Sequence, residues 1–231
     1  LNPCVLPQTR WALRQSAYSM NRSTDMREER PMMRLHEVAL SGNCHKVRLL
    51  LSMLAMPYES VAVDLAAGEQ HTPAYLALNP FGEVPTLVDG DVAIRDSQAI
   101  LVYLASRYGG ECWWPQDPVR LARIVGWLST AANEIAAGPS SLRLHRKWGR
   151  SIDVSRAETI TTRTLNVIER TLENNRWIAG DDASIADLAV YPYLALSPEG
   201  GVELAPYPHI LRWFGDIRLL EGYVTMPGMR K

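Results

Sequence analysis

Cysteine is scarce in this chain, with three among 231 residues, at positions 4, 44 and 112. A sparse and odd set argues against a disulfide framework of the kind that small secreted proteins use. The count indicates a reducing compartment, and we therefore expect a cytoplasmic protein.

An excess of charge and a long apolar run are also missing. The chain has 24 basic and 25 acidic residues, so it has no surplus of positive charge for nucleic acid or an anionic membrane surface. No apolar run approaches the roughly 18 residues that a membrane-spanning helix needs. We expect neither nucleic acid nor a membrane as a partner.

Motifs for metals and phosphates are absent from the sequence as well. The five histidines are scattered, and no pair of cysteine or histidine has the spacing of a zinc site. No glycine-rich phosphate loop occurs. The sequence therefore predicts no bound metal.

What the chain does have is a hydrophobic fraction of 47%, enough for one large or two small domains. Residues 1–32 stand apart, because they lack periodicity and are basic and free of acids up to Thr24. Such a stretch is typical of a disordered N-terminal extension, which we expect here. An organelle transit peptide and a start codon upstream of the true first residue, Met33, are the alternatives.

From Met33 to about Tyr108 the patterns of strand and helix alternate in the order β-α-β-α-β-β-α. The stretch 33–40 is apolar enough for a buried strand, and a helix pattern follows from Cys44 to Met56. On that helix we expect Lys46 and Arg48 to point away from the core. This order is typical of an α/β thioredoxin-like domain.

The most informative stretch runs from residue 79 to residue 104. Strand-length runs at 84–88 and 92–94 flank Asp89-Gly90, a dipeptide that closes two-residue hairpins. Asp96-Ser97 then opens a helix whose unpaired N–H groups suit an anion, although an ordinary helix cap is the simpler interpretation. If the Val84-Pro85 bond is cis, the Val84 backbone faces outward and can pair with an extended peptide. Together these features predict a site for a small anionic peptide.

The second half of the chain, from Asp117, contains helix patterns and no strand patterns. The first helix ends at Gly138-Pro139 in this interpretation. Ser184-Ile185-Ala186-Asp187 forms a capping box, and the helix that it opens is apolar nearly all round. We expect this helix, which contains Pro192, to be the buried centre of an all-helical domain.

The stretch with Asn79-Pro80, Val84-Pro85, Asp89-Gly90 and Asp96-Ser97 closely resembles the glutathione-binding segment of glutathione S-transferases. WIAGDDASIADLAVYPYL likewise resembles the buried helix of that family's second domain. The similarity covers residues 33 to about 226. It implies a thioredoxin-like glutathione-binding domain over 33–110 and an all-α helical bundle over 111–231.

The resemblance also implies the catalytic residue. Ser41 lies just past the first strand, where serine-type bacterial members similar to the theta, zeta and phi classes carry their catalytic serine. Ser41 and the helix start would stabilise the glutathione thiolate. Ser41-x-x-Cys44 also has thioredoxin-type spacing, and the redox cysteine of some bacterial members aligns with Asn43. Cys44 is therefore an alternative nucleophile or a buried core residue.

For glutathione itself, the family pattern assigns the cysteinyl backbone to Val84 beside Pro85, and the γ-glutamyl end to Asp96 and Ser97. Gln70 and His71 lie in the loop for the glycyl carboxylate. Glu83 replaces the usual glutamine and would repel that carboxylate unless it turns outward.

The resemblance implies a homodimeric detoxification enzyme that adds the sulfur of glutathione, its co-substrate, to a small apolar electrophile. The electrophile would lie against Arg123, Trp127 and Ala131, although these residues also suit the core or a dimer contact. A glutathione-dependent disulfide reductase or peroxidase is one alternative. A non-enzymatic binding module with a transferase fold is the other.

Overall fold

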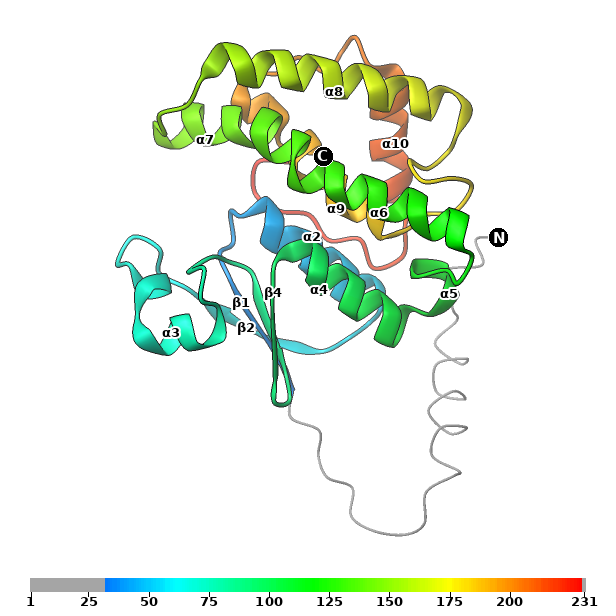
Figure 1. Ribbon diagram of the computed structural model, residues 1–231. Helices are drawn as coiled ribbons and strands as arrows, with labels where there is room; N and C mark the ends of the chain where they lie inside the picture. The colour runs from blue at the N-terminus through cyan, green and yellow to red at the C-terminus, as the bar shows by residue number, and fades with distance from the viewer. Residues whose placement is uncertain (1–31, 230–231) are drawn as a thin grey trace, which may run out of the picture.

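The computed structural model describes residues 32–229, so the predicted extension over 1–32 lies, except for Met32, outside the described residues. The chain forms an α/β half followed by a helical half, as expected (Figure 1). The helical half packs on the helices of the α/β half.

The α/β half is built on a four-stranded sheet with the order β2-β1-β3-β4. The strands are β1 (Met33–Glu37), β2 (Tyr58–Ala62), β3 (Thr86–Asp89) and β4 (Val92–Arg95). β1 pairs parallel with β2 and antiparallel with β3, and β4 pairs antiparallel with β3. This is the predicted arrangement of a crossover connection followed by a hairpin.

The prediction of a fully buried first strand is wrong for one face of β1. Met33, Leu35 and Glu37 are buried, whereas Arg34 is exposed and His36 is only partly covered. This face is only partly covered, because the helix that packs on it, Pro73–Leu78, has only six residues. Its Tyr75 ring lies 6.0 Å from the His36 ring.

The hairpin turn is also shifted by one residue from the prediction. Asp89 pairs with Val92, so the two turn residues are Gly90 and Asp91, and Gly90 has a φ of +61°. Asp89 remains in the strand because its carboxylate accepts hydrogen bonds from the hydroxyls of Tyr103 at 2.7 Å and Tyr108 at 2.6 Å.

The helices of the α/β half cover the sheet and carry the loops of interest. They are α2 (Gly42–Met53), the 3-10 turn η1 (Glu69–His71), α3 (Pro73–Leu78), α4 (Ser97–Leu104), the π turn η2 (Ala105–Gly109) and α5 (Gly110–Trp113).

The helical half contains one helix, α7 (Ser141–Trp148), that the sequence patterns did not predict. Its elements are α6 (Pro118–Ala132), the π turn η3 (Ala136–Ser140), α7 (Ser141–Trp148), α8 (Val154–Asn174), α9 (Ile185–Ala195), the 3-10 turn η4 (Ser197–Gly200) and α10 (Pro208–Arg218). We predicted that Gly138-Pro139 ends the first helix of this half. Instead, the dipeptide lies in η3, between α6 and α7. A β-carbon at Gly138 would lie 2.8 Å from the Thr161 hydroxyl, so the glycine lets α8 pack closely there.

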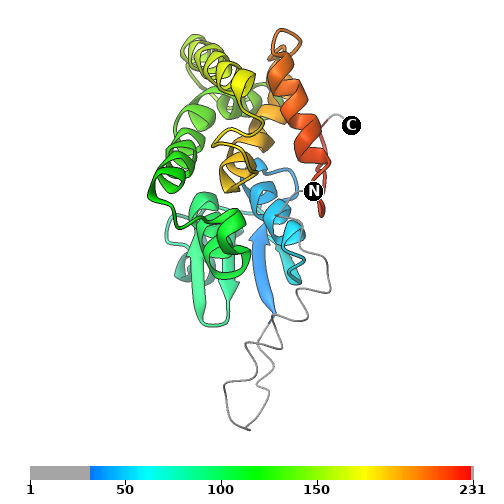
Figure 2. The ribbon, with the colours of Figure 1, turned by 90° about the vertical axis from the view of Figure 1, so that its right-hand side faces the viewer.

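The predicted central helix is confirmed. All eleven residues of α9 are buried, and the Ser184–Asp187 capping box is present. Figure 2 shows α9, in gold, between α6 and α10 and above α2. A single cluster of buried apolar side chains extends from Leu35 in β1 through α9 to Ile217 in α10.

Residues 32–229 contain neither a membrane-spanning helix nor a cluster of metal ligands. No helix in this part of the chain is long and apolar enough to cross a membrane. No group of three or more His, Cys, Asp or Glu residues in it could hold a metal ion.

Candidate active site

Three predicted segments meet at one end of the sheet. Thr86, at the start of β3, pairs with His36 near the end of β1 and with Arg95 at the end of β4. The loop after β1, the turn before β3 and the loop after β4 therefore leave the sheet at the same end. These three segments carry Ser41, Val84-Pro85 and Asp96-Ser97, respectively.

Ser41 is the N-cap of α2. Its hydroxyl oxygen accepts a hydrogen bond from the Cys44 backbone N–H at 3.3 Å, and its backbone N–H donates to the Val38 carbonyl at 3.0 Å. An oxygen that accepts in this way still carries its own proton, so the hydroxyl can donate to an anion in front of the helix.

Cys44 is fully buried directly behind this cap. Its sulfur accepts a hydrogen bond from the Val38 N–H at 3.4 Å, and burial raises the pKa of the thiol to about 11. A thiol in this state is protonated at neutral pH and is a poor nucleophile. Cys44 therefore has the properties of a core cysteine, whereas Asn43 lies partly exposed in the first turn.

The Val84-Pro85 peptide bond is cis, which is the condition on which the expected peptide site depended. The residue before it, Glu83, is exposed, but its carbonyl oxygen accepts hydrogen bonds from the Tyr75 hydroxyl at 2.8 Å and the Asn79 amide at 2.7 Å. The backbone of this loop is thus fixed from inside the protein, and the Glu83 carboxylate has no part in fixing it.

Asp96 and Ser97 form the start of α4. Asp96 is the N-cap, and its carboxylate accepts hydrogen bonds from the N–H groups of Gln98 at 2.9 Å and Ala99 at 3.0 Å. Its φ of +70° is rare for a residue with a side chain and costs conformational energy, which is common at functional sites. Ser97 is buried and its hydroxyl contacts the Gln98 side-chain oxygen. The N-cap prediction is confirmed, and Asp96 is the exposed member of the pair.

Gln70 and His71 lie in η1, against the turn before the cis peptide. A β-carbon at Gly82 would lie 2.9 Å from the His71 ring nitrogen and 3.0 Å from the Gln70 carbonyl oxygen. His71 is exposed, and within the described residues the buried Gln70 side-chain oxygen has no hydrogen-bond partner. The structure therefore brings both residues next to Glu83 and Val84.

Lys46 was predicted to point away from the core, and this prediction is wrong. It is 1% exposed, and its ammonium lies 5.5 Å from the centre of the Tyr193 ring. Burial lowers the pKa of this lysine to about 7, while the nearby acidic groups of Asp96 and Cys44 oppose the shift. The cause is the packing of both α4 and α9 on α2, which buries α2 on more than one side. Arg48, partly buried, is paired with Glu37.

The three residues suggested for the second substrate do not share one environment. Arg123 is exposed and Trp127 is half-buried, but Ala131 is 2% exposed within the core cluster. Ala131 is therefore a core residue, which corrects its assignment to the electrophile site. Of the three, Arg123 and Trp127 are accessible on α6.

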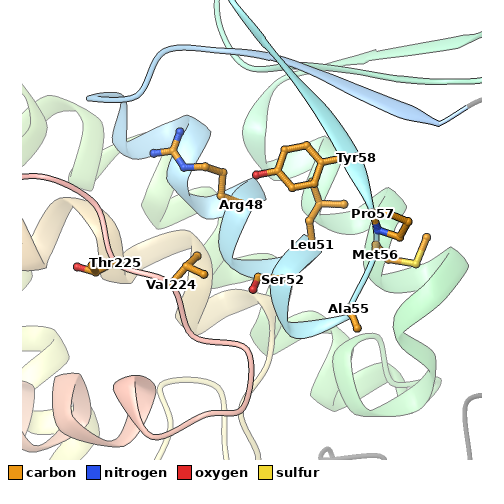
Figure 3. Close-up of a pocket in the computed structure, with 9 residues that line it drawn as sticks. All are labelled: Arg48, Leu51, Ser52, Ala55, Met56, Pro57, Tyr58, Val224 and Thr225. Carbon is orange, nitrogen blue, oxygen red and sulfur yellow. The ribbon is translucent and has the colours of Figure 1, made fainter. Parts of the chain in front are cut away.

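A separate surface cavity of about 610 Å³ lies between the C-terminal part of α2, the start of β2 and the segment with Val224 and Thr225 (Figure 3). Arg48 and Tyr58 contribute polar groups to its wall, and Leu51 is apolar. None of the predicted site residues lines this cavity, so it is distinct from the site around Ser41.

Comparison with known proteins gives matches over both halves. A family model for the glutathione S-transferase N-terminal domain matches residues 35–112, and one for the C-terminal domain matches residues 139–220. The chain is 32% identical to glutathione S-transferase 1 of Dianthus caryophyllus, over 86% of this chain and 92% of that protein. It is 33% identical to maleylacetoacetate isomerase of Pseudomonas aeruginosa, over 78% of this chain and 88% of that protein.

Solved structures give the same result. The crystal structure of a glutathione S-transferase from Pseudomonas fluorescens matches with a TM-score of 0.79 and 29% identity, over 85% of this chain and 99% of that chain. A glutathione transferase homolog of Drosophila mojavensis with bound glutathione matches with a TM-score of 0.75 and 28% identity, over 82% and 88% of the two chains. With both domain models matched in order and the predicted serine, cis-proline and helix start at one end of the sheet, this chain belongs to the glutathione S-transferase family.

Proposed function

We propose that the protein is a glutathione transferase in which the Ser41 hydroxyl stabilises the thiolate of glutathione for attack on a small apolar electrophile. The observation that carries the proposal is the cap geometry of Ser41. Because its oxygen is fixed by the Cys44 N–H, its proton is free to point away from the helix, toward an incoming sulfur. The dipole of α2 adds a further preference for negative charge at the same place.

In this proposal the tripeptide binds across the end of the sheet. The backbone of Val84, turned outward by the cis bond, pairs with the cysteinyl residue of glutathione. The backbone N–H and the hydroxyl of Ser97 hold the γ-glutamyl carboxylate, and the exposed Asp96 carboxylate faces the ammonium group. Gln70 and His71 lie on the other side of Val84, in position for the glycyl end.

Glutathione releases its thiol proton to water on binding, because the site stabilises the anion. The thiolate attacks the electrophilic carbon, a carbon–sulfur bond forms, and the leaving group departs with the electron pair of the bond that breaks. Arg123 and Trp127 on α6 are the accessible residues against which the electrophile would lie. We also propose that two copies form a two-fold symmetric homodimer.

Disulfide reduction through a protein thiol is the weaker alternative, because the raised pKa of Cys44 keeps its sulfur protonated. Isomerisation is a second candidate reaction, favoured by the 33% identity to a protein named maleylacetoacetate isomerase. Both reactions would use the same glutathione site.

Retention on glutathione-agarose, followed by turnover of a chlorinated aromatic compound, a mixed disulfide and maleylacetoacetate, tests the proposal. We expect retention and conjugation of the aromatic compound. A protein that is not retained on the column would be a binding module with a transferase fold. A retained protein that acts on the mixed disulfide alone, or on maleylacetoacetate alone, would be a reductase or an isomerase.

A further inference from the structure

The Ser41 turn is clamped by two residues of the helical half. Arg143 of α7 is 2% exposed, and its Nη1 donates to the Leu40 carbonyl at 3.1 Å. Its Nε donates to the Glu199 carboxylate at 2.5 Å, and its guanidinium carbon lies 4.8 Å from the centre of the Trp148 ring. A planar guanidinium held on three sides has little freedom to move, so the Leu40 carbonyl is held in place as well.

The Leu40 carbonyl belongs to the same peptide plane as the Ser41 N–H. That N–H donates to the Val38 carbonyl at 3.0 Å, so the plane is fixed at both edges, by Arg143 at its oxygen and by Val38 at its nitrogen. Because a peptide plane is rigid, fixing both edges sets the position of the Ser41 α-carbon, from which the hydroxyl side chain projects.

Tyr193 of α9 fixes the other side of the serine. Its ring packs so closely on Gly42 that a β-carbon there would lie 2.9 Å from the ring. The serine is thus held on both sides by residues more than 100 positions away in the chain.

We propose that Arg143 and Tyr193 are positioning residues for the Ser41 hydroxyl, so that the helical half sets the catalytic geometry of the α/β half. The proposal rests on the proposed role of Ser41. A misplacement of a reacting group by about 1 Å can cost a hundredfold in rate, so loosening this turn should affect the chemical step more than glutathione binding.

The test compares Arg143→Met with Arg212→Met. Arg212 is a matched control, because its Nη2 also donates to a backbone carbonyl, that of Leu172 at 2.8 Å, without contact to the Ser41 turn. In Arg143→Met we expect kcat to fall roughly tenfold to a hundredfold, with the KM for glutathione changed less than about twofold. The ultraviolet absorbance of the bound thiolate should fall too, while Arg212→Met should retain both kcat and absorbance.

Arg143→Lys separates position from charge. Lysine keeps the charge but cannot hold Leu40 and Glu199 in the fork of a guanidinium, so turnover should stay low. Full turnover in Arg143→Lys, or unchanged turnover per folded molecule in Arg143→Met, would overturn the proposal. If Arg143→Met does not fold, Tyr193→Leu provides the same test, because it removes the ring that packs on Gly42 beside the serine. A kcat and thiolate absorbance equal to those of the parent in this variant would also overturn it.

Hydrogen exchange of the Ser41 amide provides a measurement that does not depend on activity. We expect faster exchange in Arg143→Met than in Arg212→Met, because the peptide plane has lost one of its two anchors. Equal exchange would refute the clamp even in an active enzyme. An inactive parent protein with faster exchange in Arg143→Met would instead refute the proposed function and leave the clamp established.

Discussion

The Ser41 hydroxyl oxygen and the Cys44 backbone nitrogen are 3.3 Å apart, so the side chain that we propose to be catalytic also caps α2. Ser41→Ala should lower turnover roughly tenfold to a thousandfold, the range for loss of a key charge-stabilising donor, with little change in glutathione binding. It should also cost about 1 kcal/mol of stability through the lost cap.

Ser184→Ala is the matched control for this prediction. Ser184 caps α9 in the same manner, with its hydroxyl accepting from the Ala186 N–H, but it lies inside the capping box of the helical half. It should lose stability and keep turnover per folded molecule. Full turnover in Ser41→Ala, together with an inactive Cys44→Ala, would transfer the chemistry to the cysteine.

The start of α4 should anchor the γ-glutamyl end of glutathione. Ser97→Ala removes one hydroxyl donor while the Ser97 backbone N–H remains, so affinity should fall about tenfold, the low end for a charge-assisted bond. Asp96→Asn should weaken glutathione by a similar factor, but it should hardly affect an analogue without the amino group. Calorimetric titration measures both. If both variants bind glutathione like the parent and only unfold earlier, the pair is a helix cap alone.

Two-fold assembly is expected at micromolar concentration. The proposed homodimer should scatter light as a particle of about twice the 25.9 kDa of the chain. The α/β half of one copy should pack on the helical half of the other. A mass that stays near that of one chain over the whole concentration range would contradict this prediction.

Asp187 should be among the most sensitive positions for stability. Its buried carboxylate accepts hydrogen bonds from the N–H groups of Ile178 at 3.1 Å and Ser184 at 2.9 Å and from the Trp213 indole at 2.9 Å. Asp187→Ala leaves these donors buried and unpaired, which should cost roughly 3–5 kcal/mol. Asp153→Ala, the loss of an exposed cap on α8, should cost only about 1 kcal/mol in the same urea titrations.

His45 should make stability fall in acid. It is fully buried, both ring nitrogens lack a hydrogen-bond partner among the described residues, and burial lowers its pKa to about 3. The unfolded chain, with a histidine pKa of about 6.5, binds the proton more readily than the folded chain between these values. The contribution of His45 is therefore fully present above about pH 6.5 and declines as the pH falls toward 3. Urea unfolding at pH 7 and pH 4.5 should show a smaller loss for His45→Phe than for the parent, and equal losses would contradict the prediction.

Local signals in the sequence were sufficient for much of this site. Three features depend on residues only a few positions apart, so they can be predicted from the sequence alone. They are the proline after Val84, the Asp96 cap and the Ser184–Asp187 box. Lys46 and Arg143 were missed because their environment is made by distant segments. A lysine on a helix is normally exposed, and only the packing of α4 and α9 on α2 buries this one. The one-residue shift of the hairpin has a similar cause, since tyrosine hydroxyls from α4 and η2 hold Asp89 in its strand.

The unbroken cluster of apolar side chains from β1 to α10 has a consequence for how the molecule melts. Because α9 shares its buried surface with helices of both halves, neither half can open without exposing the other half's contacts to water. The two halves are therefore one cooperative unit, and heat or denaturant should unfold them in a single transition. A destabilising substitution in α9 should therefore lower the fraction of molecules in which Ser41 is correctly placed, even though no residue of the candidate site is changed.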